Sequence, residues 1–380
     1  MLLEFIKSRI LIISCLAVSI SAIGQNDVSN IVIGTSHIIN SEVLNQDREI
    51  QVFLPDDYST SNKNYPVLYL LDGQRFFLYG VSLYQSFHEF DLTPDFIVVG
   101  ISNEQSQRMR TFSAGANDFL KYIKEEVIPM VNTTYRTSNN RLLFGWAYAG
   151  GFGINTMIKE PHLFDGFILA SPFPTANKID SLDEFITSNK DLNTFVYFSS
   201  DKEENGVKEG TDALRNFLKN KQSNLRWNFK ELNGEVHRST PYSTLYHGIQ
   251  EYFNHYQELS FSSLEDFNSR GGLVYFKEYY KIRHEKYGKN IQPSHFNRFA
   301  LLRLAIRAND FDAFDHLFKQ LNGEQLTTEL KASRACSLAD FYLINGNKTK
   351  ASKLYKIILE KHPTDERALE GIRKSTIKTN

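Results

Sequence analysis

The pattern of hydrophobic and polar positions divides the chain at about residue 260. Before that point, short apolar runs alternate with stretches in which apolar residues recur with a helical spacing. Continuous apolar runs such as residues 67–71 are typical of strands that are buried on both faces of a parallel sheet. The apolar residues of segment 118–134 line one face of a predicted helix. This alternation predicts an α/β domain over residues 28–260, with a doubly wound, mostly parallel sheet.

The individual elements of this domain are predicted from the same two spacings. Strands are expected where apolar and β-branched residues form short runs, and helices where one face is apolar. The predicted strands cover residues 49–54, 65–71, 96–101, 141–145, 166–170, 194–199 and 225–231. Further helices are predicted over residues 151–159, 211–220 and 241–258.

After residue 260 the strand patterns stop, and paired amphipathic helices are predicted around residues 293–321 and 326–374. The second pair resembles a tetratricopeptide hairpin, which needs small residues where its helices cross, a glycine at its turn and a proline after it. The matching residues are Ala339, Tyr342, Gly346, Ala351, Tyr355, Leu359 and Pro363. A stable array needs about three such repeats. We therefore expect residues 261–380 to form a small all-α, tetratricopeptide-like region that docks on the preceding domain or on a protein partner.

The N-terminus has the three parts of an export signal. Lys7 and Arg9 precede an apolar run over residues 10–23, and small residues follow before the polar chain begins at Gln25. This order predicts a cleaved signal peptide over residues 1–24. The run is short for a membrane span, so an uncleaved anchor is the less favoured alternative. We expect an exported bacterial protein, periplasmic or secreted, without a stable membrane span after cleavage.

Composition removes several classes of function. The formal net charge is -1, whereas a nucleic-acid partner would call for a basic excess. The two cysteines are Cys15 and Cys336, so signal cleavage would leave one thiol, with no internal disulfide and no thiolate metal site. No histidine pair has the spacing of a zinc protease, and we predict neither a metal nor a cofactor.

One segment carries the outline of a catalytic motif. Residues 142–151 (LLFGWAYAGG) follow a predicted strand and open a predicted helix. A nucleophile elbow, G-x-S-x-G, occupies this setting and holds a serine hydroxyl above the sheet on a sharp turn. Here Gly145 is present, but Ala147 stands in the serine position and Ala149 in the position of the second glycine. The sequence therefore predicts an elbow without its nucleophile.

With these motifs, the first domain resembles the Putative esterase family of α/β hydrolases, which includes siderophore esterases and esterase-D-like proteins. The resemblance rests on several short segments in the family's order, in addition to the elbow. They are residues 65–73 (YPVLYLLDG), 98–101 (VVGI), 126–129 (EVIP), 134–137 (TYRT), 170–172 (A-S-P) and 234–237 (GEVH). The resemblance implies an α/β-hydrolase fold and a small-molecule ester as ligand or substrate.

The resemblance also implies positions for the catalytic groups. His237 matches the family's histidine, which would take the serine proton and return it to the leaving group. The acid that orients this histidine should follow the strand predicted over residues 194–199. Asp201 and Glu203 are the candidates, and Glu204 lies in the same loop. A solvated acidic loop without a catalytic role is the alternative interpretation.

Two further groups of residues are implied around the elbow. The backbone N–H groups of Tyr148 and Gln74 would form the oxyanion hole. Gly73, Trp146 and Phe76 would border a pocket for the acyl group, although aromatic residues beside a turn also occur as ordinary packing. The segment 108–111 resembles a family segment that has an aspartate where Thr111 stands, which puts an active-site role of this segment in doubt.

Ala147 leaves several functions open, because a methyl group cannot attack an ester. The protein is either a natural non-catalytic homologue that keeps a ligand pocket, or an active serine esterase given as a Ser→Ala variant. A third interpretation uses another nucleophile, either Ser171 or a water that His237 activates. A different class of function is a scaffold that works through its helical tail. The sequence favours the first of these, and it does not name the substrate.

Overall fold

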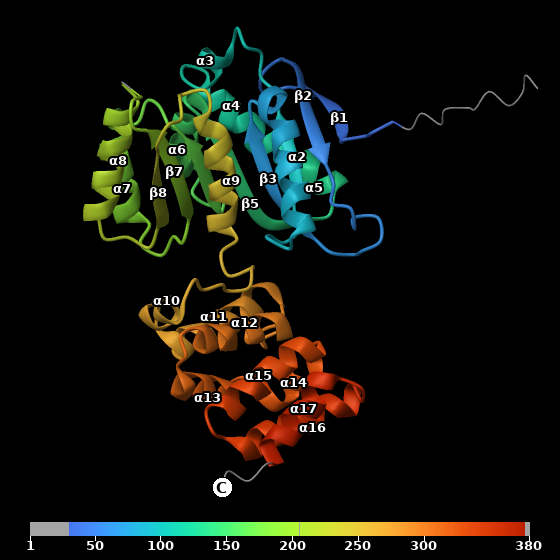
Figure 1. Cartoon of the computed structure of the whole chain (residues 1–380). Helices are drawn as coiled ribbons and strands as arrows, with labels where there is room; N and C mark the ends of the chain where they lie inside the picture. The colour runs from blue at the N-terminus through green and yellow to red at the C-terminus, as the bar shows by residue number, and fades with distance from the viewer. Residues whose placement is uncertain (1–29, 205, 377–380) are drawn as a thin grey trace, which may run out of the picture.

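The computed structural model describes residues 30–204 and 206–376, which form an α/β part followed by a helical part (Figure 1). The predicted signal peptide lies outside the described residues. Among the described residues, no helix combines the length and the apolar character that crossing a bilayer requires.

The α/β part is built on one eight-stranded sheet within the described residues. Its strand order is β1-β2-β4-β3-β5-β6-β7-β8. Strands β1 and β2 pair antiparallel, as do β2 and β4, and all later neighbours pair in parallel. The prediction of a doubly wound, mostly parallel sheet is confirmed. The strands are β1 Thr35–Ser41, β2 Gln46–Phe53, β3 Tyr65–Leu71, β4 Ile97–Ile101, β5 Thr137–Trp146, β6 Gly166–Ala170, β7 Phe195–Asp201 and β8 Arg226–Leu232.

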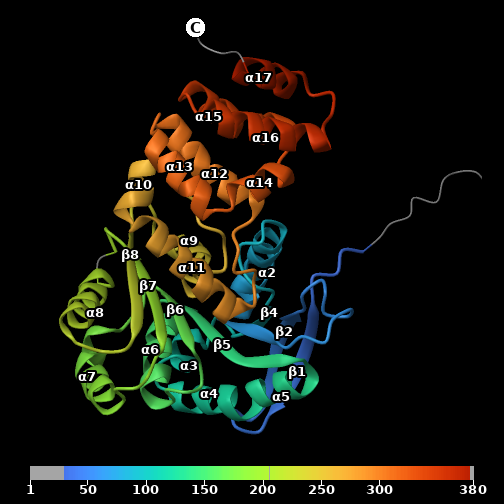
Figure 2. The same cartoon turned by 90° about the horizontal axis from the view of Figure 1, so that it is seen from below.

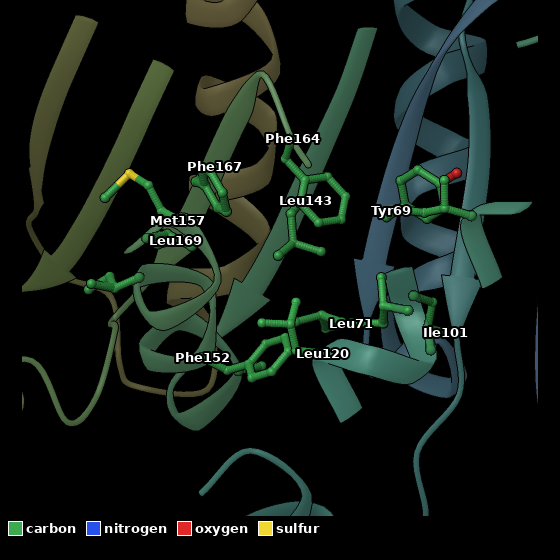
Figure 3. Close-up of a cluster of buried hydrophobic side chains, with 14 of the residues drawn as sticks. Tyr69, Leu71, Ile101, Leu120, Leu143, Phe152, Met157, Phe164, Phe167 and Leu169 are labelled. Carbon is green, nitrogen blue, oxygen red and sulfur yellow. The ribbon is translucent and has the colours of Figure 1, made fainter. Parts of the chain in front are cut away.

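Helices cover both faces of this sheet (Figure 2). Alternate residues of a strand point to opposite faces, so Leu68 and Leu70 of β3 belong to one apolar cluster while Tyr69 and Leu71 belong to another. The first cluster packs under α2 (Gly73–Glu89) and α9 (Thr240–Tyr252). The second packs under the helices of the other face, as Figure 3 shows for side chains from the strands, α4 and α6. Those helices are α4 Ala116–Tyr122, α5 Ile128–Thr134, α6 Tyr148–Lys159, α7 Ile179–Ser188 and α8 Lys208–Asn220.

Several local predictions differ from the structure. The edge strand β1 is absent from the predicted set, because its polar sequence and largely exposed pattern lack an apolar run. The helix predicted over residues 118–134 contains a π-helical turn, Ile123–Val127, between α4 and α5 (Ile128–Thr134). Helix α9 ends at Tyr252 rather than at residue 258. Short helices also occur at α3 (Arg108–Thr111) and at Ala176–Lys178.

The helical part docks at the C-terminal end of α9. Arg283 Nε donates to Tyr256 O at 2.8 Å, and Tyr279 Oη donates to Gln257 O at 2.9 Å. Lys289 Nζ pairs with Asp91, which follows α2, at 2.9 Å. These contacts fix the helical part to the end of the α/β part at which α9 finishes (Figure 1). Its helices are α10 Leu264–Ser269, α11 Gly272–Tyr287, α12 His295–Arg307, α13 Phe311–Gln320, α14 Gly323–Glu329, α15 Ala332–Ile344, α16 Lys348–Lys361 and α17 Glu366–Thr376.

Candidate functional site

The elbow exists as a sharp turn between β5 and α6. Ala147 connects the two elements with φ 54° and ψ -116°, a backbone conformation that a residue with a Cβ rarely adopts. Such a conformation costs about 1–3 kcal/mol and persists only where the surroundings enforce it. Here Ala147 N donates to Ala170 O at 2.9 Å, while Ala147 O accepts from Gly151 N at 2.9 Å and from Phe173 N at 3.0 Å. These three backbone hydrogen bonds hold the turn in place.

Close backbone approach explains the glycines around the turn. A Cβ on Gly145 would lie 2.5 Å from Ala149 O, and one on Gly151 would lie 2.3 Å from Phe173 O. Both contacts are with backbone atoms, so neither could be relieved by a side-chain rotation. Ala149 is fully buried, so the structure accommodates a methyl group in the position of the motif's second glycine. The sequence thus retains the glycines that this turn needs.

The predicted histidine stands beside a carboxylate. His237 Nδ1 and Glu204 Oε1 are 2.7 Å apart, with the His237 side chain 41% exposed and the Glu204 side chain 4% exposed. When Nδ1–H donates to the carboxylate, Nε2 of the neutral ring is free to accept a proton. The indole Nε1 of Trp146 donates to His237 O at 3.0 Å, and the two rings lie 4.9 Å apart between centroids. His237 is thereby held against Trp146, the residue that precedes Ala147 in the elbow.

The prediction of the acid partner is wrong. Asp201 and Glu203 are the predicted candidates, but the partner of His237 is Glu204. The carboxylate of Asp201 instead accepts a hydrogen bond from the backbone N–H of Glu203 at 2.8 Å, and the side chain of Glu203 is exposed. The backbone carbonyl of Glu204 accepts a hydrogen bond from Lys208 N at 2.9 Å.

A buried network fixes the carboxylate of Glu204. Ser171 Oγ lies 2.8 Å from each Glu204 oxygen, and Asp201 N donates to Oε2 at 3.0 Å. Thr240 Oγ1 lies 2.8 Å from Ser171 Oγ. Ser171 is fully buried, so it braces the acid and cannot meet an ester at the surface. The structure therefore argues against Ser171 as a substitute nucleophile.

The two predicted oxyanion positions both lie at helix N-termini. Tyr148 is the first residue of α6, and Gln74 is the second residue of α2. The first N–H groups of a helix have no acceptor within the helix and favour negative charge. The side chain of Gln74 is turned toward Asn103, whose N–H donates to Gln74 Oε1 at 2.9 Å. Both backbone N–H groups are thus in the first turn of a helix, and their role as an oxyanion hole stays a prediction.

A buried ion pair supports the loop before α2. Asp72 is 0% exposed, and its two carboxylate oxygens share the N–H of Arg108 Nε at 3.0 and 2.8 Å, while Arg108 Nη2 lies 2.7 Å from Oδ2. Burial raises the pKa of Asp72, and the hydrogen bonds from Arg108 act in the opposite direction. Arg108 also donates to Trp146 O at 2.8 Å. This arginine therefore links the loop before Gln74 to the last residue of the elbow strand.

The residues predicted to border a pocket have mainly packing roles. Phe76 is buried and packs its ring edge against Phe144, at 5.2 Å between centroids, and against Trp146. Gly73 is buried, and a Cβ there would lie 2.5 Å from the backbone of Gly100. Trp146 is half-buried and lies under the guanidinium of Arg108 at 5.0 Å. For Phe76, ordinary packing is the correct interpretation.

Comparison with known proteins identifies this arrangement. Residues 41–256, more than half of the chain, match the family described as Putative esterase. The chain belongs to this family. The resemblance inferred from the short motifs is thus confirmed, together with the hydrolase fold that it implied.

Individual relatives of this esterase homologue are distant. The uncharacterized protein YbbA of Bacillus subtilis is 23% identical over 133 residues, which are 31% of this chain and 53% of YbbA. The chain thus matches about half the length of this relative. The structure of an IroE-like serine hydrolase from Shewanella oneidensis is similar with a TM-score of 0.57 and 22% identity, over 76% of this chain and 99% of that one.

Two further structures extend the likeness. The siderophore hydrolase EstA from Aspergillus nidulans matches with a TM-score of 0.52 and 19% identity, over 61% of this chain and 99% of that chain. An uncharacterised protein from Capnocytophaga ochracea matches with a TM-score of 0.59 and 17% identity, over 90% of this chain and 99% of that chain. The last match is too long to involve the α/β part alone, so the likeness of fold includes much of the helical part.

No group of three or more histidine, cysteine, aspartate or glutamate side chains is placed to hold a metal ion within residues 30–204 and 206–376. What the site of this esterase homologue offers is a histidine–carboxylate pair, two helix N-termini and a methyl group where the nucleophile would stand.

Proposed function

We propose that this member of the Putative esterase family binds an ester-bearing small molecule at the elbow without cleaving it. The observation that carries the proposal is Ala147 in the strained elbow conformation, next to a complete His237–Glu204 pair. The pair and the turn supply binding and orientation, while the methyl group supplies no nucleophile. An enzyme of this type without its serine keeps only the weak catalysis of its oxyanion hole and its binding groups.

The surroundings of the elbow support an ester as the ligand. A carbonyl oxygen would accept hydrogen bonds from the N–H groups at the starts of α6 and α2, where the helix dipole favours negative charge. The half-exposed imidazole of His237 would donate to, or accept from, the alcohol side of the ester. Gln74 and Arg75 are exposed, and the Arg75 guanidinium lies 5.8 Å from the ring centroid of Trp146, so the surface next to the elbow can take a ligand larger than a simple acyl ester.

The structural neighbours suggest which esters to test first. EstA is described as a siderophore hydrolase, and an enterobactin esterase from Shigella flexneri, solved in the presence of enterobactin, is similar with a TM-score of 0.50. We therefore propose ester-linked siderophores as the first ligand class for this protein. Because the protein is proposed not to cleave its ligand, the intact ester itself can serve as the binding probe.

The first experiment restores the missing hydroxyl. We expect Ala147→Ser to hydrolyse p-nitrophenyl butyrate at least about a hundredfold faster than the unchanged protein, since the pair that activates a serine is in place. The matched control adds His237→Ala to the serine variant and should abolish the gain. If the serine variant and the unchanged protein hydrolyse the ester equally slowly, the elbow is not a silenced esterase site.

The second experiment measures binding directly. Isothermal titration of the unchanged protein with enterobactin should give saturable binding, and mass spectrometry of the recovered ligand should find it uncleaved. His237→Ala should weaken this binding, while Glu203→Ala, an exposed change in the neighbouring loop, should leave it as it was. Cleavage of the ligand by the unchanged protein would contradict the proposal. The methyl group of Ala147 cannot attack an ester, so another group would have to be the nucleophile.

We also propose that the protein is exported. The basic residues Lys7 and Arg9 and the apolar run that follows them support a cleaved signal peptide. N-terminal sequencing of the protein recovered from the periplasm or the medium should find a start near Gln25. Recovery of the uncleaved chain from the cytoplasm would contradict the proposal.

A further inference from the structure

The helical part contains an apolar groove with a basic rim. A cavity of about 240 Å³ lies between segment 259–261, helix α12 and helix α15. Its apolar wall includes Phe296, which is 56% exposed, and the buried Phe299 and Leu304. Most large apolar side chains of this part are buried, whereas the ring of Phe296 beside the cavity is open to contact by another group.

All charged side chains that line this groove are arginines. Arg303 and Arg307 lie four residues apart on α12, which places them on the same side of the helix. Arg334 of α15 completes the set, and no acidic residue is among the described residues that line the groove. In the part of the chain that the structure describes, none of these three arginines forms an ion pair with a carboxylate. The guanidinium groups are therefore available to an external anion.

The arginines and the aromatic rings form one surface. The Arg334 guanidinium lies over the ring of Phe296 at 5.2 Å and over that of Phe299 at 5.6 Å. This stacking holds the planar group while its N–H donors stay at the edge, where they can form paired hydrogen bonds with a carboxylate. The groove thus combines an apolar floor with charge-assisted donors at its rim.

The dimensions of the groove favour a side chain over a free small molecule. Pockets for small ligands usually enclose about 300–1,000 Å³, and this cavity is smaller. Single anchoring side chains of a partner commonly occupy pockets of this kind, with arginine and aromatic residues as the strongest contributors. A nucleic acid would need a wider basic surface than these three arginines provide.

We propose that the α12–α15 groove binds a segment of a partner protein in which one aromatic or large aliphatic side chain is flanked by acidic residues. The apolar side chain packs on Phe296 and Phe299, and the flanking carboxylates pair with Arg303, Arg307 and Arg334. The helical part is docked where α9 ends, whereas the elbow lies near its start. The thirteen residues of α9 span about 20 Å, and the elbow and the helical part lie at opposite ends of this helix. The proposal for the groove therefore stands whether or not the elbow binds an ester.

The test uses the full protein and a defined probe. Fluorescence anisotropy is measured with a fluorescein-labelled peptide, Asp-Glu-Phe-Asp-Glu, at about 0.05 M salt, where screening is weak. Binding should be saturable. The double variant Arg303→Gln/Arg307→Gln should weaken it about tenfold or more, because each lost hydrogen bond involves a charged group. The control Arg373→Gln removes one positive charge from exposed α17 and should alter the affinity less than about twofold.

Three comparisons separate this site from a general attraction for anions. The peptide Asp-Glu-Gly-Asp-Glu, which lacks the anchor, and Asn-Gln-Phe-Asn-Gln, which lacks the charges, should each bind at least about tenfold more weakly. Equal binding of the glycine peptide would overturn the proposal, and so would equal loss of affinity in Arg373→Gln. Tighter binding of a single-stranded DNA pentamer than of the phenylalanine peptide would overturn it as well, because it would assign the surface to nucleic acid.

Discussion

Removing the carboxylate of Glu204 should destabilise the α/β part far more than removing its neighbour Glu203. Glu204 is buried and accepts hydrogen bonds from Ser171 Oγ and Asp201 N, in addition to its contact with His237. Glu203 is exposed one position earlier in the same loop. The pair of variants Glu204→Ala and Glu203→Ala therefore makes the same chemical change in two different environments.

The expected size of the effect follows from these contacts. Hydrogen bonds to a charged group contribute about 1.5–3 kcal/mol each, and Glu204 accepts two from buried donors. The contact with half-exposed His237 adds less, about 0–1 kcal/mol, because solvent screens it. Ser171 can turn to Thr240, and removal of a buried charge recovers part of its desolvation cost. We therefore expect a loss of about 2–3 kcal/mol in the free energy of unfolding for Glu204→Ala.

Urea unfolding followed by tryptophan fluorescence measures this loss of stability in the α/β part. The two tryptophans of the chain are Trp146 and Trp227, and both lie in the α/β part. With a slope of about 2–3 kcal/mol per molar urea, Glu204→Ala should lower the midpoint by about 1 M. Glu203→Ala should change the free energy of unfolding by less than about 0.5 kcal/mol. Equal midpoints for the two variants, at equal slopes, would refute the assignment of Glu204 as the buried acceptor.

Three further predictions concern other parts of the chain. Hydrogen bonds from the hydroxyls of Ser239 and Ser243 lower the pKa of Glu235 below its usual value of 4.5. Its contribution to stability is thus complete above about pH 4.5 and is lost as the pH falls through the folded pKa. The difference in thermal midpoint between the unchanged protein and Glu235→Gln should therefore shrink in acid, and a constant difference would contradict this. Burial raises the pKa of Cys336 to about 12, so iodoacetamide at about pH 8 should modify this thiol in urea but not in the folded protein, as peptide mass spectrometry would detect. A Cβ on Gly73 would lie 2.5 Å from the backbone of β4, so Gly73→Ala should lower the free energy of unfolding by about 1–3 kcal/mol. An unchanged urea midpoint would contradict this expectation.

The sheet could be predicted because its strands are buried on both faces. Strand β3 consists almost entirely of apolar residues, and β4 and β6 are fully buried. In a chain of alternating strands and helices, short apolar runs of this kind are typical of a parallel sheet that helices cover on both sides. Strand β1 lies at the edge and exposes most of its residues, so its sequence carries no such run. Helix α2 is likewise missing from the prediction, although it buries Phe76, Val81, Tyr84 and other residues.

The acid partner of His237 could not be chosen from the sequence, because three acidic residues lie within four positions at the end of β7 and just after it. Which carboxylate turns inward depends on the backbone of the loop. Asp201 hydrogen-bonds to the N–H of Glu203 two residues on, a local contact that aspartate side chains form readily. The longer side chain of Glu204 reaches Ser171 and the imidazole of His237. Neither spacing nor composition encodes that choice.

The geometry of the elbow supports a retained function less strongly than the presence of His237 does. Backbone hydrogen bonds to Ala170, Gly151 and Phe173 hold the turn whatever side chain stands at Ala147. Glu204 likewise has a structural duty, since buried donors depend on its carboxylate. His237 has no comparable duty: its side chain is 41% exposed, and it donates to an acid that other donors already satisfy. If the site binds a ligand, His237→Ala should weaken that binding with little loss of stability, whereas Glu204→Ala should impair both. If the site binds no ligand, Glu204→Ala should still lower the stability of the protein, whereas His237→Ala should have little effect.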